Sequence, residues 1–386
     1  MTEWIECKIS DIGTVVGGST PSTKRTENYE NGTVAWITPK DLSTFSGRYI
    51  QRGERNITEI GLKSCSTQLL PKNTVLFSSR APIGYVAIAA NEVCTNQGFK
   101  SVVPNENTDP LFLYYLLKYN KDKIEGMGSG TTFKEVSGNT MKNIVVSVPK
   151  DKKVQETISA ILGSIDDKIE ENEKINNNLE QQAQAIYQHM LIDNPNSDWI
   201  EGSLSDIADI TMGQSPSGSS YNEDGIGTIF FQGRAEFGFR FPTIRLYTTE
   251  PKRMARINDT LMSVRAPVGD LNVAHTDCCI GRGLAAIHSK NKHQSFVLYT
   301  MFSLKKQLDI FNGEGTVFGS INRNSLNDMP ILIPSDKAIE EFDRMVAPMD
   351  AAIRNNYNEI CCLQAVRDTL LPRLMSGELD VSDIDL

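Results

Sequence analysis

The sequence contains few of the residues from which metal and redox sites are built. Histidine occurs four times in 386 residues, at positions 189, 275, 288 and 293, and this spacing gives no complete set of metal ligands. The seven cysteines, at positions 7, 65, 94, 278, 279, 361 and 362, match no paired metal or redox motif. We therefore expect no metal site, and we expect free thiols in a reducing cytoplasm.

A long hydrophobic run is also missing. No window of about 18 residues is continuously apolar, which excludes a membrane-spanning helix. The first six residues (Met-Thr-Glu-Trp-Ile-Glu) lack the basic and apolar regions of a signal peptide. Hydrophobic residues make up 39% of the chain, as in an ordinary globular protein, and the length suits two or three domains. We expect a cytoplasmic protein.

The motifs of DNA-modifying enzymes are absent as well. Residues 193–196 (Asp-Asn-Pro-Asn) lack the second proline and the aromatic residue with which a methyltransferase holds a flipped base. The glycine-rich stretch 126–130 follows a predicted helix, whereas a cofactor loop follows a strand. Residues 171–174 (Glu-Asn-Glu-Lys) resemble a nuclease motif, but helical charge pairing explains them better. We therefore predict no catalytic residues, and a methyltransferase or nuclease with an unrecognised motif is the enzyme alternative.

What the sequence does contain is a long helix signal at residues 151–191. Apolar residues recur there at alternating steps of four and three, which is the pattern of a coiled coil, and no proline interrupts it between positions 154 and 192. The same pattern returns 184 residues later, including an asparagine in the middle of each seam. A polar residue in an apolar seam weakens the packing but fixes the register. The residues predicted to pair the two helices are Ile158, Ile165, Ile169, Asn172, Leu179, Ile186, Phe342, Met349, Ile353, Asn356, Leu363 and Leu370.

The segments that precede the two helices repeat each other too. Trp-Ile-Glu at 4–6 and Ser-Asp-Ile at 10–12 return at 199–201 and 205–207, and Arg-Ala-Pro-Ile-Gly at 80–84 returns as Arg-Ala-Pro-Val-Gly at 265–269. Short β-branched runs between turns predict strands, and an apolar face predicts a helix at 109–124. We infer a tandem duplication of an α+β domain with its helix. The predicted parts are a first domain (1–150), a central spacer helix (151–195), a second domain (196–334) and a C-terminal spacer helix (335–386).

The net charge of −9 is unevenly distributed over these parts. Residues 1–150 carry +3 and residues 196–334 carry −1, whereas the helical segments 151–195 and 335–386 carry −5 and −6. The acidity therefore lies on the helices, which need solvated faces or a basic partner. The two domains can still present the local basic surfaces that binding to nucleic acid requires.

The two predicted domains agree at their turns and differ in their loops, where basic and aromatic residues alternate. Arginine can recognise guanine in the major groove, and lysine and threonine anchor phosphates. The alternative for each residue is an ordinary solvated loop. For Arg80 and Arg265, which open the repeated turn, an ion pair within the scaffold and a phosphate contact are equally open. The DNA-binding candidates are Lys24, Arg25, Trp36, Lys40, Arg48, Arg80, Thr131, Arg234, Arg240, Arg245, Arg265 and Thr316. Domains with different loops predict two different half-sites, and hence an asymmetric bipartite DNA target.

The domain–helix–domain–helix order resembles the specificity subunit of type I restriction-modification systems. So do two segments, Ser-Ile-Asp-Asp-Lys-Ile at 164–169 and Leu-Leu-Pro-Arg-Leu-Met-Ser-Gly-Glu-Leu at 370–379. The resemblance spans essentially the whole chain and implies two target-recognition domains, similar to the DNA-binding domain of single-chain adenine methyltransferases, on two long helices that pair as an antiparallel coiled coil. Asn172 and Asn176 weaken the apolar seam at the point where this pairing is expected.

The same resemblance implies partners and cofactors. Double-stranded DNA would be bound by this non-catalytic chain, and two modification subunits would dock on the helices, which act as a ruler. S-adenosylmethionine would be bound on the modification subunits, and ATP on a restriction subunit, rather than on this chain. The remaining alternative is a coiled-coil scaffold without a role in nucleic-acid binding, which would lack a basic strip across both domains.

Overall fold

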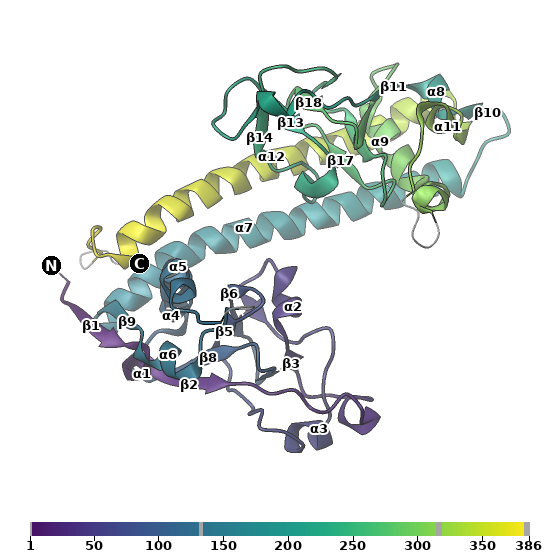
Figure 1. The fold of residues 1–386 in the computed structure, drawn as a ribbon. Helices are drawn as coiled ribbons and strands as arrows, with labels where there is room; N and C mark the ends of the chain where they lie inside the picture. Colours follow the sequence, from purple (N-terminus) through teal and green to yellow (C-terminus); the bar gives the residue numbers. More distant parts are fainter. Residues whose placement is uncertain (1, 131–133, 314–318, 382–386) are drawn as a thin grey trace. The chain divides into compact units, whose positions relative to one another are not determined.

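The computed structural model of the chain describes residues 2–130, 134–313 and 319–381. It divides into two compact units: unit 1 consists of Met1–Glu173 with Tyr357–Leu386, and unit 2 is Lys174–Asn356. The two long helices, α7 (Lys152–Tyr187) and α12 (Asp336–Met375), each run through both units (Figure 1). Each unit therefore contains a globular domain, the first half of the helix that follows it in sequence, and the second half of the other long helix.

The globular part of unit 1 is built on a five-stranded sheet with the order β2-β8-β5-β6-β4. Its first four strands pair antiparallel, and the short β4 joins β6 in parallel: β2 (Gly13–Gly17), β8 (Lys100–Pro104), β5 (Val75–Ser79), β6 (Ile83–Ala89) and β4 (Tyr49–Ile50). Two further pairs complete the strands: β1 (Trp4–Lys8) with β9 (Val145–Pro149), antiparallel, and β3 (Trp36–Ile37) with β7 (Cys94–Thr95), parallel.

Helix α4 (Pro110–Tyr119) links this sheet to the long helices. It begins where Asp109 accepts a hydrogen bond from the backbone N–H of Phe112 at 2.7 Å, and Pro110 occupies its first turn. Its apolar residues lie in one core with Val75, Phe77 and Val102 of the sheet and with residues of both long helices. The shorter helices of the unit are α1 (Ile9–Ile12), α2 (Pro39–Ser43), α3 (Glu59–Lys63), α5 (Lys121–Gly126) and α6 (Gly138–Asn143).

Unit 2 contains a four-stranded antiparallel sheet with the order β11-β19-β16-β17 and a second sheet with the order β12-β14-β13-β18-β15. The strands of the first sheet are β11 (Ala208–Met212), β19 (Leu284–Ser289), β16 (Thr260–Ser263) and β17 (Leu271–Val273). Those of the second are β12 (Tyr221–Asn222), β14 (Leu246–Thr248), β13 (Thr228–Phe231), β18 (Cys278–Ile280) and β15 (Met254–Ala255). The pair β10 (Ile200–Ser203) with β20 (Pro330–Ile333) and the helices α8 (Leu204–Ile207), α9 (Gln294–Ser303), α10 (Lys305–Leu308) and α11 (Arg323–Asn327) complete the unit.

The two globular parts share one plan. The antiparallel order β2-β8-β5-β6 corresponds to β11-β19-β16-β17, the pair β1–β9 to β10–β20, and the parallel pair β3–β7 to β13–β18. The repeated Ser-Asp-Ile segment has the same structural role in both units. Asp11 and Asp206 each accept a hydrogen bond from the backbone N–H three residues earlier, at 2.8 and 2.7 Å, which caps a short helix. The predicted α+β duplication is therefore confirmed, and the helix predicted at 109–124 appears as α4 and α5.

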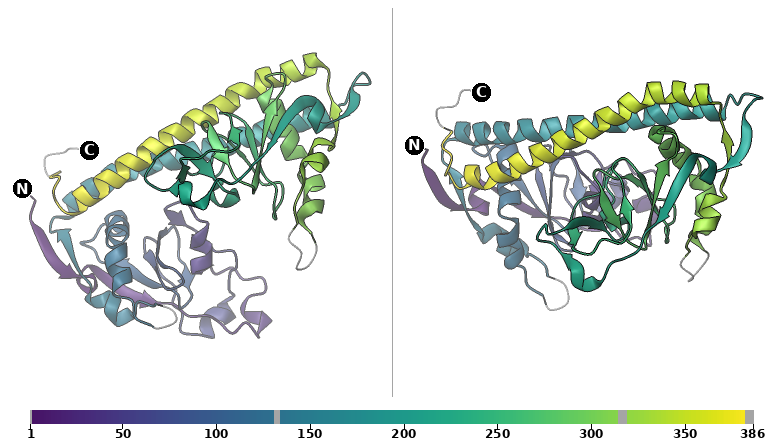
Figure 2. Two further views of the ribbon diagram at one scale, coloured as in Figure 1. Left: turned by 45° about the horizontal axis from the view of Figure 1, so that its top comes forward. Right: turned by 90° about the horizontal axis from the view of Figure 1, so that it is seen from above.

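Within unit 1, the first half of α7 runs antiparallel to the second half of α12. Asp166 accepts a hydrogen bond from Arg367 at 2.8 Å, and Asn172 donates one to Glu359 at 2.8 Å. Later residues of α7 therefore contact earlier residues of α12, as in an antiparallel pair. The two segments lie alongside each other in both views of Figure 2. Ile158 and Leu162 meet Leu374 and Met375 in the core of this unit.

Within unit 2, the second half of α7 pairs antiparallel with the first half of α12. Asn356 donates to Asn176 at 2.8 Å, and the Tyr187 ring packs edge-on against Phe342 with centroids 5.5 Å apart. The helix predicted at 151–191 is confirmed, since α7 continues as one π-helical turn at Gln188–Ile192. Among the described helices, none has the length and apolar composition needed to cross a membrane.

The residues predicted to pair the helices divide by burial. Five have little exposed surface: Ile158, Ile169, Asn172, Phe342 and Ile353. The others are half-buried: Ile165, Leu179, Ile186, Met349, Asn356, Leu363 and Leu370. Asn172 and Asn176 are 1% and 3% exposed, and each has a polar partner within its own unit. Both therefore lie inside the helix pair without an unsatisfied amide, as register-fixing polar residues require.

Candidate nucleic-acid interface

The repeated Arg-Ala-Pro-x-Gly turn joins two strands of the main sheet in each unit. In unit 1, Ser78 donates to the carbonyl of Pro82 at 2.8 Å and accepts from the N–H of Tyr85 at 2.8 Å. In unit 2, Ser263 donates to Pro267 at 2.6 Å and accepts from Asp270 at 2.9 Å. The last glycine of each turn has a positive φ, +100° at Gly84 and +84° at Gly269, which favours glycine. The serine side chains and the final glycines therefore stabilise the two turns in the same way.

The predicted basic candidates lie on the surface in several cases, and many of them have an acidic neighbour. In unit 1, Lys40 contacts Glu54 at 2.7 Å and Arg80 contacts Glu135 at 3.5 Å. Lys24 is exposed, and exposed Arg25 lies 4.0 Å from Glu27. In unit 2, Arg234 contacts Asp270 at 2.6 Å, and Arg245 contacts Glu223 and the buried Glu236 at 3.2 and 2.8 Å. An ion pair between two exposed side chains, such as Lys40 with Glu54 or Arg25 with Glu27, contributes about 0–1 kcal/mol, so a phosphate can displace it at little cost. The carboxylates that pair with Arg80, Arg234 and Arg245 are half-buried or buried, so these pairs are harder to displace.

Arg265 differs from its counterpart Arg80. It is exposed, and no carboxylate in the described part of the chain pairs with it. The position that corresponds to Glu135 is Ser320, whose backbone forms a bridge with that of Arg265. For Arg80, the structure thus records a scaffold ion pair; for Arg265, a phosphate contact stays a prediction.

Trp36 is buried in a small core with Tyr29, Ile57 and Cys94, and its indole N–H donates to the carbonyl of Ser19 at 3.2 Å. It therefore supports the loop rather than facing solvent. Thr131 and Thr316, the two threonine candidates, lie outside the described residues.

The sequence predicts Arg48 at the DNA surface, but the structure places it against helix α7. Its side chain is 4% exposed and donates to Glu170 at 2.9 Å, to Asp167 and to the carbonyl of Gly163 at 3.2 Å. Burial alone would lower the pKa of Arg48, but the hydrogen bonds to Glu170 and Asp167 outweigh it and raise the pKa. Because every guanidinium nitrogen faces α7, Arg48 fits an anchor between loop and helix better than a contact with DNA.

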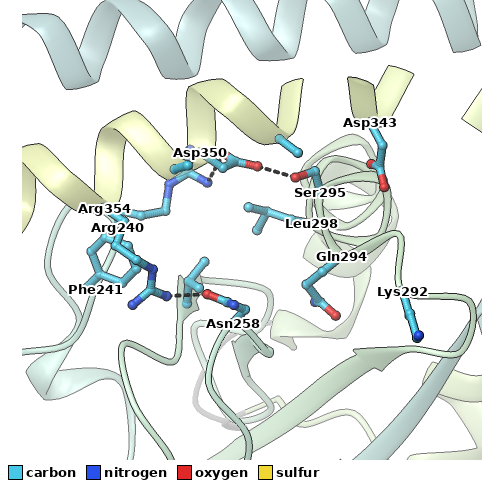
Figure 3. A pocket seen from close by; sticks show the side chains of 13 residues that line it. Arg240, Phe241, Asn258, Lys292, Gln294, Ser295, Leu298, Asp343, Asp350 and Arg354 are labelled. Atoms are coloured by element: carbon cyan, nitrogen blue, oxygen red, sulfur yellow. Dashed lines mark hydrogen bonds and ion pairs between the residues drawn. The ribbon is translucent and has the colours of Figure 1, made fainter. Parts of the chain in front are cut away.

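Arg240 has the corresponding position in unit 2 (Figure 3). Its side chain is also 4% exposed, and its guanidinium lies 2.9 Å from Glu180 of α7 and 3.1 Å from Asp350 of α12. Burial opposes its charge, yet Tyr299, Asp350 and Glu180 raise its pKa. In each unit, therefore, an arginine of a variable loop is held by carboxylates of the long helices.

A second polar contact joins each domain to its helix. Tyr115 of α4 donates to Asp166 at 2.6 Å, and Tyr299 of α9 donates to Asp350 at 3.0 Å. The two pairs are 184 residues apart, which is the offset of the helix repeat. Burial, followed by the neighbouring carboxylate, raises the pKa of the Tyr115 phenol, and burial raises that of Tyr299. The sequence could have shown these pairs, since both members of each recur at one offset.

Beside Arg240 lies a cavity of about 330 Å³ between the globular part of unit 2 and α12 (Figure 3). Arg354 of α12 lines this cavity. Its guanidinium donates a hydrogen bond to the carbonyl of His275 at 2.7 Å and lies 4.8 Å from the centre of the Phe241 ring. Burial lowers the pKa of Arg354. At the positions of Asp167 and Glu170 in unit 1, unit 2 has Ala351 and Arg354, so the two anchors are built from different helix residues.

The side chains that could support metal or thiol chemistry are scattered or buried. Throughout residues 2–130, 134–313 and 319–381, no group of three or more histidine, cysteine, aspartate or glutamate side chains is arranged to hold a metal ion. All seven cysteines are free. Burial raises the pKa of the Cys94 thiol to about 11 and that of Cys278 to about 12, which keeps both protonated at neutral pH.

Comparison with known proteins gives a consistent result. Residues 1–181 match the family model described as type I restriction modification DNA specificity domain. The specificity subunit of the type I restriction enzyme MjaIX from Methanocaldococcus jannaschii is 32% identical over 417 residues, covering 99% of this chain and 95% of that protein. The specificity subunit of the HindI enzyme from Haemophilus influenzae is 27% identical over 152 residues, covering 38% of this chain and 32% of that protein.

A solved structure agrees at the level of the fold. The crystal structure of a type I restriction-modification S subunit from M. genitalium has a TM-score of 0.63 and 17% identity, with 97% of this chain and 96% of that chain covered. The fold thus defines a class of proteins with two similar α+β domains and two long antiparallel helices. Within that class, the chain belongs to the family of type I restriction-modification specificity subunits.

Proposed function

We propose that this chain is the DNA-reading, non-catalytic subunit of a type I restriction-modification complex and that it recognises an asymmetric bipartite target. The observation that carries the proposal is a duplicated hydrogen-bonded frame with two different sets of loops. The turns at Ser78 and Ser263 match, while the loop segments around Lys40 and Arg234 differ in sequence and in ion pairs. Two domains that share a fold but differ in their loops are suited to recognising two different half-sites.

In this proposal, residues 1–150 and 196–334 are the two target-recognition domains, and 151–195 and 335–386 are the spacer helices. The acidic outer faces of the helices suit docking of two modification subunits, which would bind S-adenosylmethionine and methylate adenine. A restriction subunit with ATP would complete the complex, and the cytoplasm is its expected location. The anchors at Arg48 and Arg240 would transmit the position of each loop to the helices.

A domain exchange tests this proposal. Residues 196–334 are replaced by the matching domain of another specificity subunit, the chain is assembled with its modification subunits, and methylated positions are mapped by sequencing. We expect one half-site to change while the other half-site and the gap stay the same. A change in both half-sites would refute separate readers, and methylation by the purified chain alone would refute a non-catalytic role.

Inserting one heptad into each helix, between residues 172 and 176 and at the matching point of α12, tests the ruler. The expected result is a longer gap between unchanged half-sites, because each helix lengthens by about 10 Å at 1.5 Å per residue. An unchanged gap with retained binding would exclude the ruler role.

A further inference from the structure

Three backbone segments of unit 2 meet at a junction formed by glycines. The N–H of Gly283 donates to the carbonyl of Gln232 at 3.3 Å, and the N–H of Val264 donates to the carbonyl of Gly283 at 3.0 Å. A Cβ atom on Gly283 would lie 2.9 Å from the Gln232 oxygen, so the close approach requires glycine. We call Gln232, Gly233, Val264, Gly281 and Gly283 the glycine junction.

Each segment carries an arginine within two residues of this junction. These are Arg234, Arg265 and Arg282, and all three are exposed. Arg234 is paired with Asp270 at 2.6 Å. For Arg265 and Arg282, the described residues supply no carboxylate partner, so two positive charges are left uncompensated by them at one place on the surface.

The equivalent junction of unit 1 has the same backbone bond but a different charge pattern. The N–H of Ser79 donates to the carbonyl of Gly98 at 2.7 Å, as Val264 does to Gly283 in unit 2. Arg80 there contacts Glu135 at 3.5 Å, and Glu135 also contacts Lys100 at 3.2 Å. The residue at the position of Arg282 is the neutral Gln97, which is hydrogen-bonded to Thr20.

We propose that Arg265 and Arg282 form a seat for DNA backbone phosphates in unit 2 that unit 1 lacks. The inference rests on the proposed function, since it assigns part of DNA binding to these two residues. A guanidinium without a carboxylate neighbour gains a full charge-assisted contact with a phosphate, whereas Arg80 must first give up Glu135. DNA binding is then unequally shared: the second domain carries more of the salt-dependent affinity, and the first relies more on its remaining contacts.

The test measures DNA affinity against salt for the full chain assembled with its modification subunits. The probe is a fluorescent DNA duplex with the target sequence that methylation mapping identifies, and NaCl is varied between about 50 and 200 mM. Each lost phosphate contact lowers the slope of log K against log salt by about 0.9. We expect a loss of about 0.9 for Arg265→Ala and for Arg282→Ala, about 1.8 for the double variant, and little change for Arg80→Ala.

Two further variants exchange the residues at the equivalent positions 135 and 320, so that the two units of the same chain can be compared directly. Ser320→Glu installs the unit 1 carboxylate beside Arg265 and should reduce the slope as Arg265→Ala does. Glu135→Ser releases Arg80 and should raise it. Thermal unfolding checks that each substitution leaves the fold intact. Where Arg265→Ala, Arg282→Ala or Glu135→Ser lowers the Tm, the glutamine variant of the same residue takes its place.

The possible outcomes distinguish a failure of the phosphate contact from a failure of the proposed function. An unchanged slope in the double arginine variant, with the parent still binding steeply, overturns the phosphate seat alone. A loss of discrimination at one base pair, in place of a uniform loss on all duplexes, would also overturn it, because that marks contact with a base edge. A parent complex without salt-dependent binding to any duplex would refute the proposed function itself.

Discussion

Replacing Arg48 by methionine separates two roles for this residue. The side chain lies in a variable loop of unit 1, and its guanidinium contacts Glu170, Asp167 and the carbonyl of Gly163 on α7. Methionine keeps most of the apolar volume and removes every one of these hydrogen bonds. If Arg48 is an anchor, the substitution detaches the loop from the helix without removing a contact with DNA.

The loss of stability depends on how well the carboxylates of Glu170 and Asp167 are solvated once Arg48 is removed. Breaking a buried ion pair by removing one partner costs about 3–5 kcal/mol, because the other charge stays buried. Asp167 has a 72% exposed side chain and can be solvated, whereas Glu170 is 22% exposed. We therefore expect the lower end, about 3 kcal/mol, which corresponds to a fall in Tm of about 6–12 °C for a unit of this size.

The assay combines calorimetry with hydrogen exchange. Arg48→Met should lower the first thermal transition and increase exchange in the loop before β4 and in α7 near Gly163, whereas the exposed Arg52→Met should shift Tm by no more than about 1–2 °C. At a temperature where the variant is folded, the salt slope of DNA binding should equal that of the parent. A stable variant whose slope falls by about 0.9 would refute the anchor and restore the phosphate contact.

Three further predictions concern the helices, a close backbone contact and the thiols. Asn172→Leu should raise the free energy of unfolding by about 1 kcal/mol in urea titrations, because it replaces a buried amide in the apolar seam; a lower midpoint would contradict this. Gly213→Ala should destabilise unit 2 by about 2 kcal/mol or more, since its Cβ would lie 2.1 Å from a backbone oxygen, while Gly218→Ala, with open space around it, should be nearly neutral; equal effects would disprove the steric reasoning. A thiol reagent should modify the exposed Cys361 and Cys362 first and the buried thiols of β7 and β18 only on unfolding, as peptide mapping can establish, and early labelling of β18 would count against its burial.

The repeats and the helices could be predicted from the sequence because they depend on periodic or local signals. The four-three alternation predicts α7 to within a few residues, and the rigid turns that begin at Arg80 and Arg265 share four of their five residues. Strand β5 and helix α4 follow from short apolar runs in the same way. The helices and strands require information only from residues close together in the chain, and the repeat requires only a comparison of two short segments of the sequence.

The environment of each loop arginine could not be predicted in this way. Arg48 and its partner Glu170 are 122 residues apart, and nothing in the loop itself distinguishes Arg48 from the exposed Arg52. Trp36 likewise resembles a stacking residue in sequence but lies in a core with Tyr29. Arg282 is not among the predicted contacts, because the equivalent residue in the first repeat is the neutral Gln97. Arg282 could be found only from a difference between the two repeats, whereas the prediction used the residues on which they agree.

The core of the first domain also has a consequence for synthesis of the protein. Leu374, Met375 and Val381 pack in it with Phe112 and Ile158. Thr2 donates a hydrogen bond to Asp380 at 2.8 Å, so residues made early in translation meet residues made late. A nascent chain therefore carries an unfinished first domain until these late residues leave the ribosome. A stop codon ahead of Leu374 would damage that domain although every codon between positions 1 and 150 is intact.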